Sequence, residues 1–261
     1  MNFNEKEIMN VVSQILGDNA TGIYIHEDIV NRDISYEDAD LLSSIGENPW
    51  HISEIEGYAV SYGMNKMCIY PINKRVPWVI KIPITGIYAF KSDLEDSDED
   101  EDEDEDDFED YFLERKAIQT GIAQQDFCDE EIAIYENCSS DVQKVMAKNY
   151  YVGHFNKIPI YIQEKVSSCH ATINSKYGSK YDYITNEINF LMDINSGIEN
   201  EDFVYNIVLN YGITKAIEIF EELSSTVDDL HDGNYGYNRQ GRAVIFDYAG
   251  YDSSYQYKFI A

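Results

Sequence analysis

Three oxygen-bearing side chains near the end of the chain have the types and spacing that phosphoryl transfer requires. Asp229 lies five residues before Asn234, and Asp247 directly follows the apolar stretch 244–246. Phosphoryl transfer needs a carboxylate that orients the attacking hydroxyl, and oxygen ligands that hold Mg²⁺ against the nucleotide phosphates. Mg²⁺ usually takes only one or two carboxylates from a protein. The spacing therefore predicts Asp229 as the catalytic residue and Asn234 and Asp247 as metal ligands.

A lysine inside an apolar strand offers a second part of such a site. Lys81 lies in the apolar segment 77–83, where an ammonium group needs an anionic partner or a path to water. The helical segment 126–135 carries two adjacent glutamates. We favour Glu131 as the partner, since it shares a helix face with an aromatic residue one turn later, and Glu130 is the alternative. An outward-facing lysine and solvated glutamates are the plainer interpretation.

Several of these segments resemble motifs of one known family. Asp229-Leu230-His231-x-Gly233-Asn234 is similar to the catalytic loop of the protein-kinase-like phosphotransferases, especially the Asp-Leu-His-x-Gly-Asn loop of aminoglycoside and choline kinases. Asp247-Tyr248-Ala249 resembles their metal-binding Asp-Phe-Gly, and Val79-Ile80-Lys81 resembles Val-Ala-Ile-Lys. The alternative is that the two acidic motifs are surface turns beside a buried strand.

The resemblance implies a two-lobed α+β fold, with an antiparallel-sheet N-lobe that contains one main helix and a reduced, mainly helical C-lobe. It also implies that ATP and Mg²⁺ bind, that Lys81 and Glu131 position the phosphates, and that the main chain of a hinge binds adenine. The implied hinge residues are Gln163, Glu164 and Val166.

Two glycines offer a further phosphate contact. A glycine-containing turn between strands can lay backbone N–H groups on phosphates, which side chains would obstruct. Gly57 and Gly63 occupy that position in the sequence. An ordinary hairpin is the alternative.

Apolar periodicity predicts the elements that would position these residues. Helical spacing covers residues 3–16, 126–135, 183–194 and 213–227. Strands are predicted at 56–63, 67–70, 77–83, 150–155, 158–166 and 242–246. We expect three units, namely an N-terminal extension (1–50), an N-lobe (51–166) and a C-lobe (167–261).

An acidic stretch interrupts the predicted N-lobe. Residues 93–110 include fifteen acidic side chains, which is half of the net charge of −30. Such a block repels itself and buries little apolar surface, so we expect a disordered insertion at about 91–112. One interpretation is a solvated loop; the other is a segment that binds a basic partner or inhibits the nucleotide site.

Charge and composition narrow the range of expected partners and the expected cellular location. The negative charge disfavours nucleic acids and anionic membranes as partners, and we expect neither a membrane helix nor a signal peptide. Four scattered cysteines predict reduced thiols and a cytoplasmic location.

The prediction is an ATP- and Mg²⁺-dependent phosphotransferase that acts on a protein hydroxyl. Only residues 248–261 follow Asp247, so the activation segment and later helices of a protein kinase are not expected. This truncation keeps two alternatives open. They are a catalytically inactive pseudokinase and an acidic protein that binds a basic partner; a nucleic-acid mimic is a further, weaker interpretation.

Overall fold

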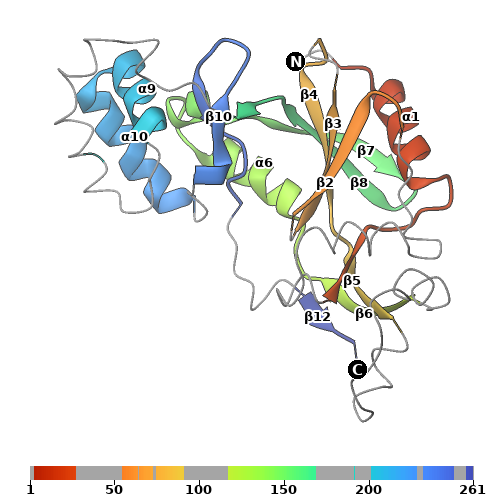
Figure 1. Ribbon diagram of the computed structural model, residues 1–261. Helices are drawn as coiled ribbons and strands as arrows, with labels where there is room; N and C mark the ends of the chain where they lie inside the picture. The colour runs from red at the N-terminus through yellow and green to blue at the C-terminus, as the bar shows by residue number, and fades with distance from the viewer. Residues whose placement is uncertain are drawn as a thin grey trace, which may run out of the picture.

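The chain forms an α+β structure with mainly antiparallel sheets (Figure 1). The computed structural model describes residues 3–27, 55–63, 65–72, 75–90, 117–168, 191, 201–227, 232–249 and 257–260. Within these ranges the α-helices are α1 (Glu5–Leu16), α6 (Phe127–Asn137), α9 (Glu201–Tyr211) and α10 (Ile213–Thr226). Two short 3-10 helices are η2 (Val142–Val145) and η3 (Asp232–Asn234). No helix in the described ranges is both long and apolar enough to cross a membrane.

The largest sheet has five antiparallel strands in the order β2-β3-β4-β8-β7. Its strands are β2 (Tyr58–Tyr62), β3 (Lys66–Pro71), β4 (Trp78–Pro83), β7 (Asn149–Phe155) and β8 (Ile158–Glu164). Side chains alternate between the two faces of a strand, so Ile80 and Ile82 lie on one face of β4 and Lys81 lies on the other. The apolar face joins a buried core, and the opposite face carries the candidate site.

Helix α1 contributes to that apolar core. The side chain of Asn4 caps the helix by accepting a hydrogen bond from the Lys6 backbone N–H at 3.1 Å, and Gly17 ends it at φ 78°. The buried residues of α1 belong to the same cluster as the isoleucines of β4. Helix α1, in the predicted N-terminal extension (1–50), thus packs in the same core as the five-stranded sheet.

A four-stranded sheet has the order β1-β5-β6-β12. Its strands are β1 (Tyr24–His26), β5 (Gly86–Phe90), β6 (Ala117–Ala123) and β12 (Tyr257–Phe259). Strand β1 pairs with β5 in parallel, and the other pairings are antiparallel. The acidic stretch lies outside the described residues, but it joins strand ends that are paired, since Phe90 stands opposite Ala117.

This sheet contains strands that the sequence analysis did not predict. Strands β5 and β6 were not predicted, although they flank the acidic stretch. Residues 257–259 were assigned to the C-lobe, but β12 pairs with β6.

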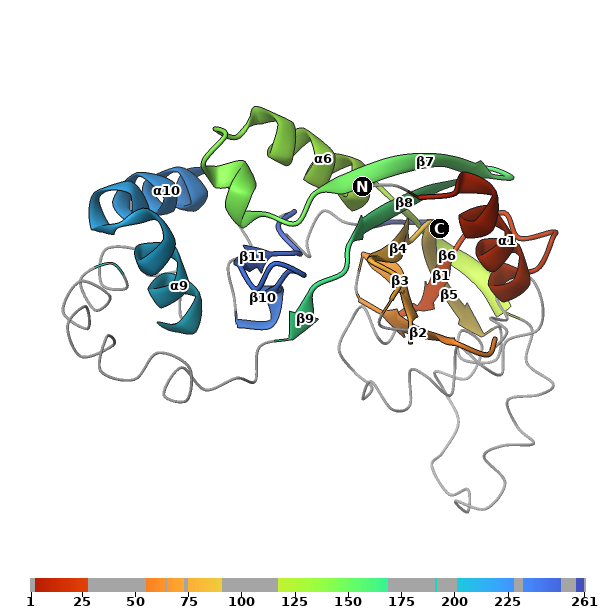
Figure 2. The same ribbon diagram turned by 90° about the horizontal axis from the view of Figure 1, so that it is seen from above.

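A second core lies at the other end of the molecule. It contains buried residues of η2, α9 and α10 together with the hairpin of β10 (Tyr235–Tyr237) and β11 (Ala243–Ile245). Strand β10 also pairs with β9 (Ser167–Ser168). Figures 1 and 2 show α9 and α10 at one end, α1 and the two larger sheets at the other, and α6 with the β10–β11 hairpin between them.

The helices predicted at 3–16, 126–135 and 213–227 are confirmed as α1, α6 and α10. The predicted helix at 183–194 lies outside the described residues except for Leu191, which is helical and buried. Helix α9 was not predicted.

Candidate functional site

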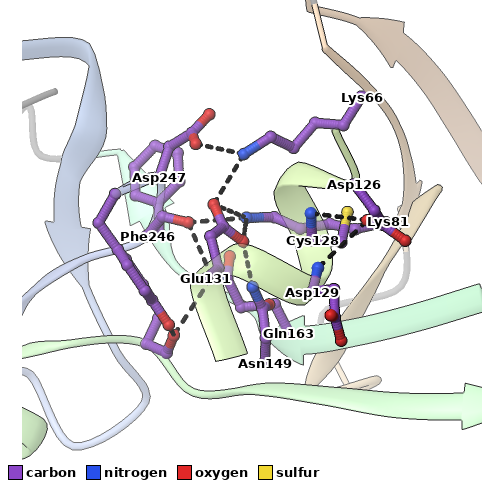
Figure 3. Close-up of polar contacts among 12 residues, drawn as sticks. Lys66, Lys81, Asp126, Cys128, Asp129, Glu131, Asn149, Gln163, Phe246 and Asp247 are labelled. Carbon is purple, nitrogen blue, oxygen red and sulfur yellow. Dashed lines mark hydrogen bonds and ion pairs between the residues drawn. The ribbon is translucent and has the colours of Figure 1, made fainter. Parts of the chain in front are cut away.

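Strand β4 directs Lys81 toward α6. The side chain is 2% exposed, and its Nζ lies 2.9 Å from Oε2 and 3.2 Å from Oε1 of Glu131 (Figure 3). Glu131 is fully buried, whereas the sequence alternative, Glu130, is partly exposed. The predicted contact between Lys81 and Glu131 is therefore present in the structure.

The start of α6 fixes the direction in which Glu131 points. The side chain of Asp126 accepts hydrogen bonds from the backbone N–H groups of Cys128 at 3.0 Å and Asp129 at 3.1 Å. Asp126 also accepts a hydrogen bond from the Tyr161 hydroxyl at 2.7 Å. This cap ties the first turn of α6 to β8 and so holds Glu131 against the sheet.

Glu131 accepts hydrogen bonds from three side chains on three strands. Lys81 comes from β4, Asn149 from the start of β7, and Lys66 from the start of β3. Asn149 and both lysines are buried. A buried carboxylate is tolerated where such donors satisfy it.

Lys66 is a site residue that the sequence analysis missed. Its side chain is 3% exposed, and Nζ lies 2.7 Å from Glu131 Oε1 and forms a second ion pair with Asp247. Cys68 stands opposite Lys81 on the neighbouring strand, so Lys66, two residues earlier, shares that face. The two-residue spacing from Cys68 identifies Lys66 once the pairing of β3 with β4 is known. The sequence does not show that pairing.

Lys66 and Asp247, at the two ends of this ion-pair cluster, are both charged at neutral pH. Burial on its own would lower the pKa of Lys66, but the carboxylates of Glu131 and Asp247 outweigh it and raise this pKa well above its ordinary value. Burial also opposes ionisation of Asp247, yet the ammonium groups of Lys66 and Lys81 lower its pKa to about 2. Lys66 and Asp247 thus form an ion pair of opposite charges.

The backbone just before Asp247 is held by two strands of the sheet. The Phe246 carbonyl accepts hydrogen bonds from Lys81 Nζ at 2.8 Å and from Gln163 Nε2 at 2.7 Å. Gln163 also donates to the Ala147 carbonyl at 3.2 Å. Gln163 was predicted as a hinge residue, and its buried side chain has this additional role of positioning the chain beside Asp247.

The β10–β11 hairpin brings Asn234 and Asp247 to the same end. Tyr235 stands opposite Ile245, and the Asn234 carbonyl accepts a hydrogen bond from the Phe246 N–H at 2.9 Å. Amide and carboxylate oxygens are ligands that suit Mg²⁺. The chemistry of this pair fits a magnesium site, with the Asp247 side chain 30% exposed. The predicted catalytic residue, Asp229, lies outside the described residues.

The glycines predicted to contact phosphate lie in the β2–β3 hairpin. The Gly63 N–H donates to the Lys66 carbonyl at 2.9 Å, and the Gly57 carbonyl accepts from the Ile72 N–H at 2.8 Å. Gly57 has φ +87°, a conformation that favours glycine. The Gly63 N–H is therefore already bonded within the hairpin. This geometry agrees with the alternative of an ordinary hairpin.

The other predicted hinge residues follow the end of β8. Glu164 stands opposite Trp78, and burial raises its pKa. The next residue, Lys165, donates its backbone N–H to the Pro77 carbonyl at 2.8 Å. Val166 packs close to β10, because a Cβ added at Gly236 would lie 2.3 Å from Val166 Cγ1. Adenine binding by this segment stays a prediction.

Comparison of the chain with protein-family models, curated proteins and solved structures gave no match.

Proposed function

We propose that this protein is an ATP- and Mg²⁺-dependent phosphotransferase of the protein-kinase-like type, acting on a protein hydroxyl. The observation that carries the proposal is the buried Lys81–Glu131 ion pair, bonded through Lys81 to the carbonyl that precedes Asp247. In protein kinases a lysine on the third strand binds the nucleotide phosphates and pairs with a helix glutamate, while the Asp of Asp-Phe-Gly holds Mg²⁺.

The arrangement of the elements supports the same proposal. Lys81 lies on the third strand of the five-stranded sheet, and Glu131 lies on the helix that precedes the last two strands of that sheet. The hairpin that carries Asn234 and Asp247 packs in the other core, with α9 and α10. We propose on this basis that the two cores correspond to the two lobes of a kinase-like fold.

In the proposed reaction each residue has a separate task. Asp229 accepts a hydrogen bond from the acceptor hydroxyl and takes its proton as the phosphoryl group is transferred. Lys81, aimed by Glu131, positions the nucleotide phosphates, and the main chain at residues 163–166 binds adenine. Asn234 and Asp247 would hold Mg²⁺, which, when bound, neutralises charge on the phosphate oxygens.

The test is the Asp229→Ala variant, compared with Asp228→Ala as its matched neighbour. The Asp229 carboxylate contacts the acceptor and not the nucleotide in this mechanism. We therefore expect Asp229→Ala to lower radiolabel transfer from ATP by orders of magnitude with little change in ATP affinity. Asp228→Ala should leave both quantities close to wild type.

Two results would contradict the proposal in different ways. Undiminished transfer by Asp229→Ala would show that another residue serves as the base. Wild-type protein that binds ATP and Mg²⁺ but transfers phosphate to no acceptor, itself included, would instead favour the pseudokinase alternative.

A further inference from the structure

Two buried lysines, rather than one, converge on the Glu131 carboxylate. Figure 3 shows Lys66 reaching both Glu131 and Asp247, while Lys81 reaches Glu131 and the Phe246 carbonyl. We propose that Lys66 is a second phosphate-binding lysine of this site. The inference rests on the proposed function and adds a residue to it.

Of the two carboxylates that compensate the buried Lys66, Glu131 is shared with another lysine and Asp247 is partly exposed. Glu131 already has Lys81 on both oxygens and Asn149 on one, so one buried cation balances its charge. Asp247 is 30% exposed and can be hydrated by water. Removing an ammonium group from water costs several kcal/mol unless strong partners compensate. A polyphosphate brings enough negative charge to use a second lysine beside Lys81.

The geometry also indicates how Lys66 would change partners when a nucleotide binds. Lys66 forms one ion pair with the fully buried Glu131. Its other partner, Asp247, is the most exposed of the four charged side chains. Asp247 is also the predicted magnesium ligand. When a nucleotide and its metal bind, Lys66 exchanges the Asp247 carboxylate for a phosphate oxygen and stays anchored to Glu131.

Binding without metal isolates the contribution of the lysine. We would measure ATP and adenosine affinities by calorimetry in EDTA for four proteins. These are the wild type, Asp247→Asn, the double variant Lys66→Met/Asp247→Asn, and Lys144→Met, which changes an exposed lysine. The double variant removes one cation and one anion together, so Glu131 retains Lys81.

The expected result is specific for phosphate. Asp247→Asn releases Lys66 from its ion pair and should bind metal-free ATP at least as tightly as the wild type. The double variant should bind ATP on the order of 10- to 100-fold more weakly than Asp247→Asn, as is typical for losing a hydrogen bond to a charged group. Adenosine affinity should be equal in all four proteins, and Lys144→Met should match the wild type.

A labelling experiment on the wild type serves if the double variant does not fold. An acyl-phosphate derivative of ATP transfers its acyl group to a lysine beside the phosphates. The ammonium group first loses a proton to solvent, and the neutral amine attacks the acyl carbonyl. The bond between acyl carbon and phosphate oxygen then breaks, ATP leaves, and the nitrogen loses a second proton to solvent as the amide forms. Peptide mass spectrometry should find acylated Lys66 as well as Lys81, and excess ATP should suppress both.

Three outcomes would overturn the inference. The first is equal ATP affinity of the double variant and Asp247→Asn, and the second is a parallel loss of ATP and adenosine binding, which would indicate a structural role. The third is labelling of Lys81 without Lys66. Wild-type protein that binds no ATP with or without Mg²⁺ is a separate result, because it refutes the proposed function itself.

Discussion

Glu131 is the residue through which three strands are joined to α6. Its carboxylate is fully buried and holds two ammonium groups and one amide. Removing one partner of a buried ion pair leaves the other charge without compensation, which costs more than the pair contributes. The site therefore depends on Glu131 for its stability as well as for the direction of Lys81.

Replacing Glu131 by Gln should destabilise the protein by about 3 kcal/mol or more, because two buried lysines would then share the one remaining carboxylate, that of Asp247. Urea unfolding monitored by circular dichroism gives this free energy. Glu136→Gln is the control, since Glu136 lies exposed on the same helix and its replacement should change stability by less than about 0.5 kcal/mol. Similar stabilities for the two variants would show that the ion pairs contribute little.

The sequence predicted three of the four charged residues of the ion-pair cluster as site residues, Asp247 among them as a metal ligand. Lys81 could be identified because a cation inside an apolar strand is unusual, and Glu131 because it shares an apolar helix face. Lys66 could not be identified in this way, because it is the first residue of β3. The direction of its side chain depends on the register in which β3 pairs with β4. Nor could the sequence show that the Gln163 side chain turns inward to the Phe246 carbonyl.

The β10–β11 hairpin has little room for a larger residue at its centre. Gly236 stands opposite Ser168 on one side and Val244 on the other. A Cβ at this position would lie 2.3 Å from Val166 Cγ1 and 2.7 Å from the Ser167 carbonyl oxygen. The hairpin that carries Asn234 and Asp247 therefore needs glycine at its centre.

Gly236→Ala should lower the free energy of unfolding by about 1–3 kcal/mol, because the backbone must shift to admit the methyl group. Gly63→Ala is a suitable control, since a Cβ there would only make an ordinary 3.6 Å contact with the Lys66 carbonyl oxygen. Thermal unfolding of both variants without ligand checks the prediction. A Gly236→Ala protein as stable as Gly63→Ala would mean that β9 can move away from β10 at little cost.

Periodic elements were the ones that the sequence predicted well. Helices α1 and α10 have one buried face and one polar face, which produces clear helical spacing. In α9, residues 203–208 are all buried, so no polar stripe marks it as a helix. Strand β5 is likewise buried at every position, and β12 is a three-residue strand whose partner lies far away in the sequence.

The whole molecule carries a large excess of negative charge. The net charge is −30, and fifteen of the acidic side chains lie in residues 93–110. Charges of one sign repel each other in the compact state, and salt screens that repulsion. Ionic strength should therefore stabilise this protein.

Deleting residues 93–110 should leave the fold intact and reduce the increase in melting temperature on adding NaCl. The strand ends that this segment joins are already paired, and loop-closure entropy changes only slowly with length. Thermal unfolding at low and high salt tests both expectations. A variant of full length, with the acidic residues changed to Ser and Asn, separates charge from length. If the deletion melts several degrees lower and this variant does not, the segment makes structural contacts.

The pairing of β12 with β6 has a consequence for the order of events during translation. Strand β6 leaves the ribosome long before residues 257–259 are made, so one edge of the four-stranded sheet stays open while the rest of the chain is synthesised. An open edge offers unpaired backbone groups to any other nascent chain. Until residues 257–259 leave the ribosome, that edge of β6 is open to pairing with another chain.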